Sequence, residues 1–303
     1  MKKNIDILVP LYNESQSVEI FWNSRLKPVL TSLREHYEFK VIFLNNASTD
    51  DTFQKLQNIR KTSSIVEFVT YTRNVGYQNS LLGGLGLSTG HAVIVIDSDG
   101  EDPPSLIADF LDYFERGFHV VYGDRRNRKE VFWMKYLRKL FYLIMNHAAD
   151  VEVIKDMAEF SLISKDCKTY VLLASRNNSF PFIRAETARS GLSRIGIPYA
   201  RENRIGGQSN YNLLSSFTFA VAAFLTASTL PLRILGILGP ILFLVGMMGY
   251  VFGFFQFVGI VFISYLVLVG AFVSLYTARI YVNQLDRPRF IIDSTKSTLS
   301  EVQ

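Results

Sequence analysis

The chain has 303 residues, a formal net charge of +5 and a hydrophobic content of 49%. This length is enough for one large domain with an appendage and for a sizeable hydrophobic core. The modest positive charge suits anionic lipid headgroups or a phosphorylated substrate, and basic and aromatic residues are not interleaved in the way that nucleic-acid binding would require. The single cysteine, Cys167, excludes an intrachain disulfide.

Five short apolar segments near the N-terminus predict β-strands, because they are rich in β-branched residues. They cover residues 5–9, 41–44, 65–71, 92–96 and 120–122. Segments with helical patterns lie between them, at about residues 15–30, 51–60, 77–88 and 104–116. Apolar strands that alternate with helices indicate an α/β domain whose mainly parallel sheet is covered on both faces.

Polar residues follow four of these strands at the points where the strands end. The segments are Pro10-Leu11-Tyr12-Asn13-Glu14, Asn45-Asn46-Ala47-Ser48-Thr49-Asp50, Thr72-Arg73-Asn74 and Asp97-Ser98-Asp99. In open parallel sheets, ligands bind outside the carboxyl ends of the strands. The sequence therefore predicts a binding site along one edge of the sheet.

Four carboxylates are crowded into residues 97–102, directly after the fourth strand. Like charges this close repel one another unless a cation lies between them. Asp97 and Asp99 supply the oxygen ligands that a divalent cation prefers, and a cation bound there would keep positions open for phosphate oxygens. A nucleotide diphosphate is the natural partner of such a cation, because the cation stabilises the charge that develops as the diphosphate leaves.

Glu101 and Asp102 have a second interpretation. Pro103 and Pro104 predict the start of a helix and Gly117 its end, so both acids could instead lie at a helix N-terminus and cap it. We assign Asp102 to this cap, whereas Glu101 stays a third metal ligand. Other phosphate and metal motifs are absent, since the sequence has no P-loop GK[ST] and its four histidines lack a zinc spacing.

No charged residue occurs between Arg233 and Arg279. A bilayer span takes about 20 apolar residues, so this stretch predicts two membrane helices, at residues 232–254 and 258–278, with a turn near Gln256. A buried hairpin in a soluble core is the alternative, but such a core rarely needs two consecutive helices that are apolar all round. The predicted organisation is a soluble domain at 1–210, an interfacial amphipathic helix at 211–231, two transmembrane helices at 232–280 and a tail at 281–303.

Positive residues near the ends of the two spans predict their orientation. Arg233 precedes the first span, Arg279, Arg287 and Arg289 follow the second, and the turn between the spans has none. We therefore expect a multi-pass protein of the inner membrane whose N-terminal domain and two chain ends are cytoplasmic. Residues 213–229 are also uncharged and could form a third span, but their serines and threonines and the proline that follows favour a helix in the interface plane.

An ordered set of motifs resembles family 2 glycosyltransferases. The set comprises PLYNE at residues 10–14, NNASTD at 45–50, TRNVG at 72–76, DSDGEDPP at 97–104 and VVYGDRR at 120–126. The similarity is greatest to the membrane-bound polyprenyl-phosphate and dolichyl-phosphate sugar transferases, because two C-terminal spans followed by RIYVNQLDRPRF are typical of that branch. The resemblance implies a GT-A-like fold and an inverting enzyme that moves a sugar from a nucleotide donor, expected to be UDP-linked, to undecaprenyl phosphate at the cytoplasmic membrane face. Its product would supply lipid-linked sugar for the cell envelope.

The resemblance also implies roles for individual residues. The nucleotide donor would be held by Pro10, Tyr12, Glu14, Asn46, Arg73, Asp97 and Ser98. Mg²⁺ or Mn²⁺ on the diphosphate would be bound by Asp97, Asp99 and Glu101. A phosphate of the donor or of the lipid acceptor would face Arg125, Arg126 and Arg128. The family's G-D-F-R-L motif corresponds to residues 158–162, which adds Glu159 to Asp99, Arg125 and Arg126 as catalytic residues.

Two departures from that branch concern the acceptor side. Ser161 stands where relatives have an arginine, and Asn210 stands where they have a lysine, within the segment 207–211 that corresponds to the family's G-E-S-K-Y hairpin. The missing positive charge could come from Arg184, Arg201 or Arg204.

The acceptor decides what Glu159 must do. A phosphomonoester has a second pKa of about 6, so at neutral pH it is already a nucleophile and Glu159 would position metal or acceptor. The alternative acceptor, a saccharide or glycolipid hydroxyl, would need Glu159 as a base. An inactive membrane scaffold is a further alternative, to which Asn45 and Asn46 point but the retained acidic motif does not. Residues 131–147 have the pattern of a helix at the membrane surface or in the core, and the sequence leaves a homo-oligomer open.

Overall fold

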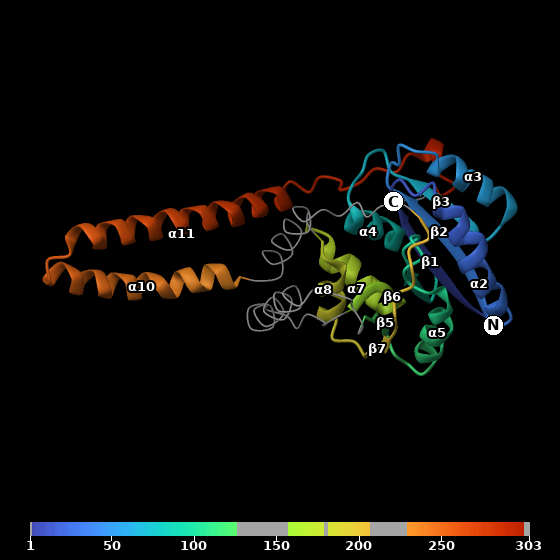
Figure 1. The fold of residues 1–303 in the computed structure, drawn as a ribbon, viewed down its shortest axis with the longest axis horizontal. Coiled ribbons are helices and arrows are strands. Elements are labelled where there is room, and N and C mark those ends of the chain that lie inside the picture. The colour runs from blue at the N-terminus through green and yellow to red at the C-terminus, as the bar shows by residue number, and fades with distance from the viewer. Residues whose placement is uncertain (1, 126–156, 179–180, 207–228, 300–303) are drawn as a thin grey trace.

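The computed structural model describes residues 2–125, 157–178, 181–206 and 229–299 (Figure 1). An α/β body holds the N-terminal part of the chain, and a long helical hairpin projects from it. Several features predicted from the sequence lie outside the described residues: Arg126, Arg128, the helix at 131–147, the segment 207–211 with Asn210, and most of the interfacial helix at 211–231.

Within the described residues, a seven-stranded sheet with the order β3-β2-β1-β4-β6-β5-β7 forms the centre of the body. Its strands are β1 (Lys3–Leu11), β2 (Tyr37–Asn45), β3 (Val66–Thr70), β4 (Ala92–Val95), β5 (Val120–Asp124), β6 (Met157–Ser164) and β7 (Arg194–Pro198). β1 pairs in parallel with β2 and β4, β2 with β3, and β5 with β7. β6 runs antiparallel to β4 and β5. The mainly parallel sheet is confirmed, and β6 and β7 are strands that the sequence pattern does not predict.

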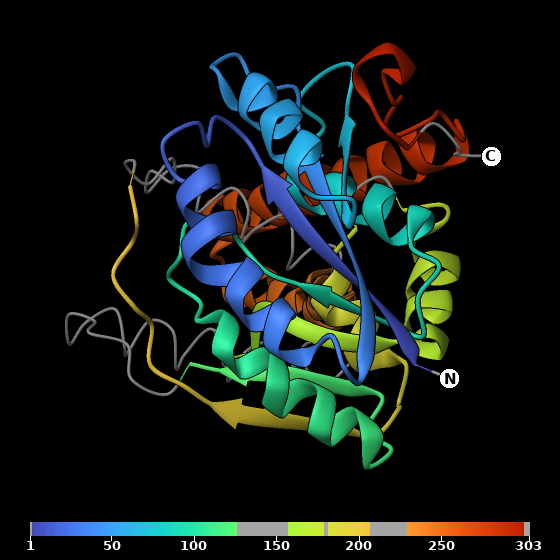
Figure 2. The same ribbon diagram turned by 90° about the vertical axis from the view of Figure 1, so that its right-hand side faces the viewer.

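Helices cover both faces of the sheet, as the sequence predicts (Figure 2). One face carries α1 (Val18–Ile20), the π-helix η1 (Phe21–Leu26), α2 (Lys27–Leu33), α3 (Thr52–Thr62) and α5 (Ile107–Glu115), which the short η2 (Pro104–Leu106) precedes. The other face carries α4 (Tyr77–Leu87), α7 (Lys165–Ser175) and α8 (Ile183–Arg189).

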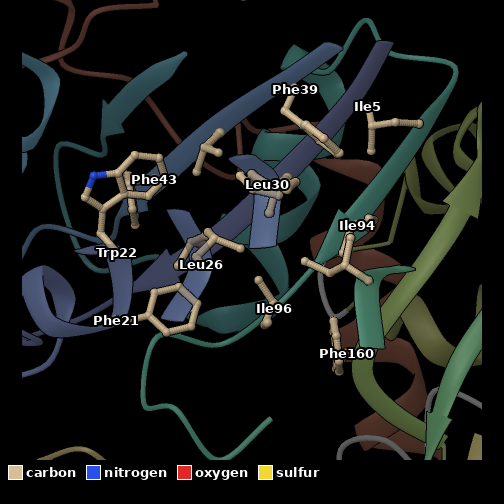
Figure 3. Packing of buried hydrophobic residues seen from close by; sticks show 14 of the residues in the cluster. Ile5, Phe21, Trp22, Leu26, Leu30, Phe39, Phe43, Ile94, Ile96 and Phe160 are labelled. Carbon is tan, nitrogen blue, oxygen red and sulfur yellow. The ribbon is translucent and has the colours of Figure 1, made fainter. Parts of the chain in front are cut away.

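The core consists of two hydrophobic clusters, one on each face of the sheet. Neighbouring residues of β1 point to opposite faces, so that Ile7 packs in the cluster under α1 to α3 and Leu8 packs in the cluster under α4 and α7. Figure 3 shows the first cluster, in which Trp22 lies edge-on to Phe43 with 6.3 Å between the ring centroids. The sheet is thus buried from both sides and is a rigid support for its polar edge.

Cys167 belongs to the second cluster and is fully buried near the start of α7. Burial raises the pKa of its thiol to about 11 from an ordinary value of 9.0. Because a rise of two units lowers the thiolate fraction at pH 8 about 100-fold, we expect Ellman's reagent to label the native protein at least ~100-fold more slowly than the guanidinium-unfolded chain. Equal labelling rates, followed by absorbance, would show that Cys167 is accessible and would contradict this packing.

The helices α10 (Leu230–Val251) and α11 (Phe255–Gln284) form the projecting antiparallel hairpin (Figure 1). Its stretches Leu230–Gly249 and Val258–Gln284 have mean hydropathies of 2.0 and 2.5 and are long and apolar enough to cross a bilayer. In the apolar 18-residue window of each stretch, only 6% and 0% of the residues are buried within the protein. The helices of a soluble core would be covered, so the exposed apolar surface fits association with a membrane.

The turn of the hairpin lies at residues 252–254 and not near Gln256 as predicted. Gly253 has a φ of +82°, a left-handed conformation that glycine adopts without steric cost. Beside it the helices approach closely, because a Cβ on Gly249 would lie only 2.5 Å from the Val258 side chain. Two glycines therefore fix where the chain reverses.

Candidate functional site

The carboxyl ends of the central strands meet at one edge of the sheet. The strand register pairs Leu11 of β1 with Asn45 of β2, and Asn45 with Thr70 of β3. The segment after β4 reaches the same edge, since the Ile96 amide donates a hydrogen bond to the Leu8 carbonyl at 3.1 Å. The predicted gathering of polar strand ends is therefore confirmed.

The loop after β1 is held against the loop after β2. The Asn13 amide donates to the Ser48 hydroxyl at 3.0 Å, and the Asn13 side-chain oxygen accepts from the Thr49 amide at 2.8 Å. Asn13 adopts a left-handed φ of +56°, a conformation that asparagine tolerates better than most residues. Pro10 is buried in β1, whereas Tyr12 is 37% exposed at the edge of the sheet.

Glu14 lies in the loop between β1 and α1 and is half-buried. Its amide donates to the Thr52 hydroxyl at 2.9 Å, and its carboxylate accepts a hydrogen bond from the Ser17 hydroxyl. Burial raises the pKa of Glu14, although the Ser17 hydrogen bond and the charge of Arg204 act in the opposite direction. The carboxylate is thus partly shielded from water, and it lies close enough to Arg204 and Asp99 for their charges to affect its pKa.

Asn46 organises the loop that follows β3. Its side-chain nitrogen donates to the Asn74 side-chain oxygen at 2.9 Å, and its side-chain oxygen accepts from the Val75 amide at 2.9 Å. Both polar ends of this buried amide are therefore used inside the protein. Arg73, on the same loop, is exposed. The loop thus presents a cation at the edge, and Asn46 holds the loop in place.

The acidic segment after β4 is paired with arginines from a distant part of the chain. Asp99 Oδ2 lies 2.8 Å from Arg204 Nη2, and Glu101 forms an ion pair with Arg201. Glu101 Oε1 also lies 3.7 Å from Arg204 Nε. The backbone amides of Glu202 and Ile205 donate to the carbonyls of Glu101 and Asp99, each at 2.9 Å. Residues 201–205 therefore run beside the acidic segment and compensate part of its charge, while Ser98 between the acids is buried.

Asp97 differs from its neighbours because, within the described residues, no lysine or arginine forms an ion pair with it. Its Oδ1 accepts a hydrogen bond from the Tyr77 hydroxyl at 2.8 Å. Burial, together with the charges of Asp102 and Asp99, raises the pKa of Asp97 to about 7. A carboxyl in this position gains most from a cation brought by a ligand.

Among the described residues, no group of three or more His, Cys, Asp or Glu side chains is arranged to hold a metal ion. The oxygen chemistry of Asp97 and Asp99 nevertheless suits Mg²⁺ or Mn²⁺. Burial, together with the charges of Asp102 and Asp99, raises the pKa of Asp97, so a bound cation would stabilise its ionised form. Glu101 points to Arg201, so it is the least available of the three predicted ligands.

Asp102 does not cap a helix, contrary to the prediction. The residue before η2 is Pro103, and no side chain caps that helix. Asp102 is 1% exposed and instead accepts hydrogen bonds from Arg125 at 3.1 Å and from the Tyr199 hydroxyl. Burial of Arg125 acts to lower its pKa, but the negative charge of Asp102 and the Tyr199 hydroxyl outweigh this effect and raise the pKa. The structure therefore places the predicted catalytic Arg125 in a largely buried ion pair with Asp102, the last acid of the acidic segment.

Glu159 lies on β6, close to Arg184 at the start of α8. Its Oε1 is 2.9 Å from Arg184 Nε and accepts a hydrogen bond from Gln78 at 3.4 Å. Arg184 also donates to the Met157 carbonyl at 2.9 Å. The Ser161 hydroxyl, on the same face of β6, donates to the backbone carbonyl of Glu159 at 3.0 Å. Arg184 thus supplies a positive charge near Ser161, the position at which the family resemblance implies an arginine.

Sequence reasoning missed three polar residues of the site: Tyr77, Gln78 and Tyr199. Tyr77 and Gln78 open α4 directly after the polar end of β3, so the strand-end rule could have included them. Tyr199 follows β7, a strand that the sequence pattern does not predict, and no local signal marks it.

Comparison with known proteins identifies the family. Residues 6–169 match the family model described as glycosyl transferase family 2. The chain belongs to this family. A glycosyltransferase from Synechocystis sp. that is described as uncharacterized is 30% identical over 82% of this chain and 76% of its own length. A bactoprenol glucosyl transferase of Shigella phage SfX is 28% identical over 96% of this chain and 99% of its own length.

A solved structure confirms the fold class of this family 2 glycosyltransferase. Glucosyl-3-phosphoglycerate synthase from Mycobacterium tuberculosis, solved with Mn²⁺, UDP and phosphoglyceric acid, superimposes with a TM-score of 0.50 at 19% identity. The match covers 74% of this chain and 77% of the synthase. The chain therefore has a GT-A-like fold, as the resemblance of its motifs implies, with an apolar helical hairpin after it.

Proposed function

We propose that the chain is an inverting, metal-dependent glycosyltransferase that moves a sugar from a UDP-linked donor to undecaprenyl phosphate at the cytoplasmic face of the inner membrane. The observation that carries the proposal is that one chain joins an acidic strand-end loop to an exposed apolar helical hairpin. The bactoprenol glucosyl transferase, which is similar over almost the whole chain, supports a polyprenyl acceptor and makes glucose the first sugar to test.

Asp97 and Asp99 would hold a divalent cation on the donor diphosphate, with Glu101 as a third ligand once its pairing with Arg201 gives way. The Mn²⁺ and UDP bound by the mycobacterial synthase of similar fold support this part of the proposal. Mg²⁺ or Mn²⁺ would stabilise the charge that develops on the departing diphosphate.

The nucleotide would lie along the edge formed by the loops after β1, β2 and β3. Tyr12 and Arg73 are exposed there and are the side chains best placed to contact it. Pro10, Glu14, Asn46 and Ser98 are more buried and would act by shaping these loops. The remaining predicted phosphate ligands are Arg125, Arg126, Arg128 and Arg184.

In the proposed reaction a phosphate oxygen of the acceptor attacks the anomeric carbon of the sugar. The bond between that carbon and the donor diphosphate breaks, and UDP leaves with the bonding electrons. The acceptor is already ionised at neutral pH, because the second pKa of a phosphomonoester is about 6. No side chain has to remove a proton, so Glu159, which is occupied by Arg184 and Gln78, would have a positioning role.

The hairpin would place this chemistry at the membrane. We retain residues 1–210 as the cytoplasmic domain, 211–231 as an interfacial helix, 232–280 as two membrane helices and 281–303 as a cytoplasmic tail. The arginines at both outer ends of the hairpin support this orientation by the positive-inside rule. An acceptor phosphate at the cytoplasmic leaflet would then face the edge that binds the donor.

The test is an assay of the purified, detergent-solubilised chain with radiolabelled UDP-glucose, MgCl₂ or MnCl₂, and undecaprenyl phosphate. We expect label to enter a lipid-extractable product, and EDTA to prevent it. Transfer only to saccharide or glycolipid hydroxyls would refute the acceptor assignment. Absence of transfer from a panel of nucleotide sugars, in protein that is folded and binds no UDP, would favour an inactive scaffold.

A further inference from the structure

The chain that follows α11 returns to the α/β body and lies along the free edge of β3 (Figures 1 and 2). β3 is the outermost strand on its side of the sheet, so its outer amides and carbonyls need partners. The Thr72 amide donates to the Ile291 carbonyl at 3.0 Å, and the Asp293 amide donates to the Thr70 carbonyl at 2.8 Å. The returning segment therefore pairs with β3 as an irregular extra strand.

Two hydroxyl side chains of this segment complete the pairing. Ser297 Oγ accepts from the Thr70 amide at 2.9 Å, and Thr298 Oγ1 accepts from the Phe68 amide at 2.8 Å. The Thr298 amide donates to the Phe68 carbonyl at 2.9 Å. Side chains therefore satisfy two amides of the edge strand for which the returning backbone supplies no acceptor.

Apolar contacts anchor the same segment in the core. The ring of Phe290 lies edge-on to that of Tyr71, with 5.6 Å between the centroids. Ile292 and Leu299 pack against the hydrophobic cluster under α4 and α7. At the start of the segment, Arg289 donates to the Ser175 carbonyl at the end of α7. Contacts from Arg289 to Leu299 thus anchor this segment to the α/β body.

The bonded positions of β3 lead directly into the site. The Thr70 hydroxyl accepts from the Asn45 side chain at 3.3 Å, and the Tyr71 amide donates to the Asn45 carbonyl at 3.0 Å. Thr72, fixed by Ile291, immediately precedes Arg73 in the loop that Asn46 holds from the other side. The loop with Arg73 is therefore held between the loop after β2 and the C-terminal segment.

We propose that residues 290–299 are a positioning segment for the nucleotide-binding edge, which ties the loop of Arg73 to the end of the membrane hairpin. This inference rests on the proposed function, because it assigns the loop of Arg73 to the UDP moiety of the donor. Pairing of an extended segment with a sheet edge is strong enough for recognition between chains, and here it acts within one chain. Its loss should weaken donor binding and leave binding of the lipid acceptor unchanged.

The variant Ser297→Ala/Thr298→Val removes both side-chain acceptors and retains the backbone of the segment. We expect the dissociation constant for UDP with MnCl₂, measured by calorimetry on the full chain in detergent, to rise at least about fivefold. Hydrogen exchange should accelerate in the peptide that covers residues 66–74. The KM for undecaprenyl phosphate should stay within a factor of about two, a split that a general loss of folding would not give.

Ser294→Ala is the matched control, because Ser294 is an exposed residue of the same segment whose hydroxyl makes no hydrogen bond to β3 among the described residues. It should leave UDP affinity and exchange unchanged. UDP affinity within about twofold of wild type in the double variant, despite faster exchange at 66–74, would overturn the positioning role. Wild-type protein that binds no UDP would instead refute the proposed function. The experiment therefore distinguishes failure of the positioning role from failure of the proposed function.

Discussion

Asp99→Asn is expected to abolish turnover while the protein stays folded. Asp99 is a predicted ligand of the divalent cation, and an amide has neither the charge nor the second anionic oxygen that such a cation prefers. The loss of one preorganised electrostatic group typically costs about 100- to 1,000-fold in kcat, so we expect at least the lower figure. Initial rates with UDP-glucose, undecaprenyl phosphate and saturating Mn²⁺ measure the effect.

The fold should tolerate this change for a local reason. Asp99 pairs with Arg204 at 2.8 Å, and an asparagine oxygen can still accept that hydrogen bond. The melting temperature should therefore stay close to that of wild type. Asp109→Asn on α5 is the matched control, because Asp109 is exposed and, among the described residues, makes no hydrogen bond or ion pair with the acidic segment. Wild-type rates in the Asp99 variant would discard the metal assignment.

The parallel part of the sheet could be predicted because its strands are buried on both faces. Such strands are apolar without interruption, and helices of ordinary length separate them. Only their ends differ from the prediction: β1 extends to Leu11 because Pro10 and Leu11 continue to pair with β2. The site edge followed from the same pattern, since polar residues occur where the apolar runs stop.

β6 could not be predicted, because its sequence is not typical of a strand. MAEFSLIS places Glu159 and Ser161 among apolar residues, and the strand is stabilised by antiparallel pairing with β4 and β5 on its two sides. Pairing with neighbours decides strand formation more than local propensity does. The position of Glu159 relative to Arg184 was hidden for the same reason.

Partners that are distant in sequence explain the rest of the site. Arg204, which bonds to Asp99, lies 105 residues further along the chain. Tyr199, which bonds to Asp102, lies 97 residues further along. A local rule assigned Asp102 to a helix cap, whereas the tertiary partner Arg125 binds it instead. The ends of strands can be recognised from the local sequence, whereas the charged residues that pair with them cannot.

The ion pair between Asp102 and Arg125 gives the second large predicted effect, a loss of stability. Asp102→Ala is expected to destabilise the protein by about 3–5 kcal/mol, because it leaves the largely buried Arg125 without its charge partner. The side chains of Asp102 and Arg125 are only 1% and 14% exposed, so water cannot take over the lost contacts. Since 1 kcal/mol shifts the melting temperature of a domain of this size by about 2–4 °C, we expect a drop of about 10 °C in a thermal unfolding experiment.

Two variants show whether the loss comes from the buried charge. Asp112→Ala removes an acid whose pair with Arg116 is more than half exposed, and such pairs contribute less than about 1 kcal/mol, so its melting temperature should barely change. Asp102→Leu/Arg125→Met removes both charges together. Replacing a buried pair by apolar side chains is often neutral, so this double variant should be more stable than Asp102→Ala. If it melts at the same temperature or lower, packing and the hydroxyl of Tyr199, and not an unpaired charge, explain the role of Asp102.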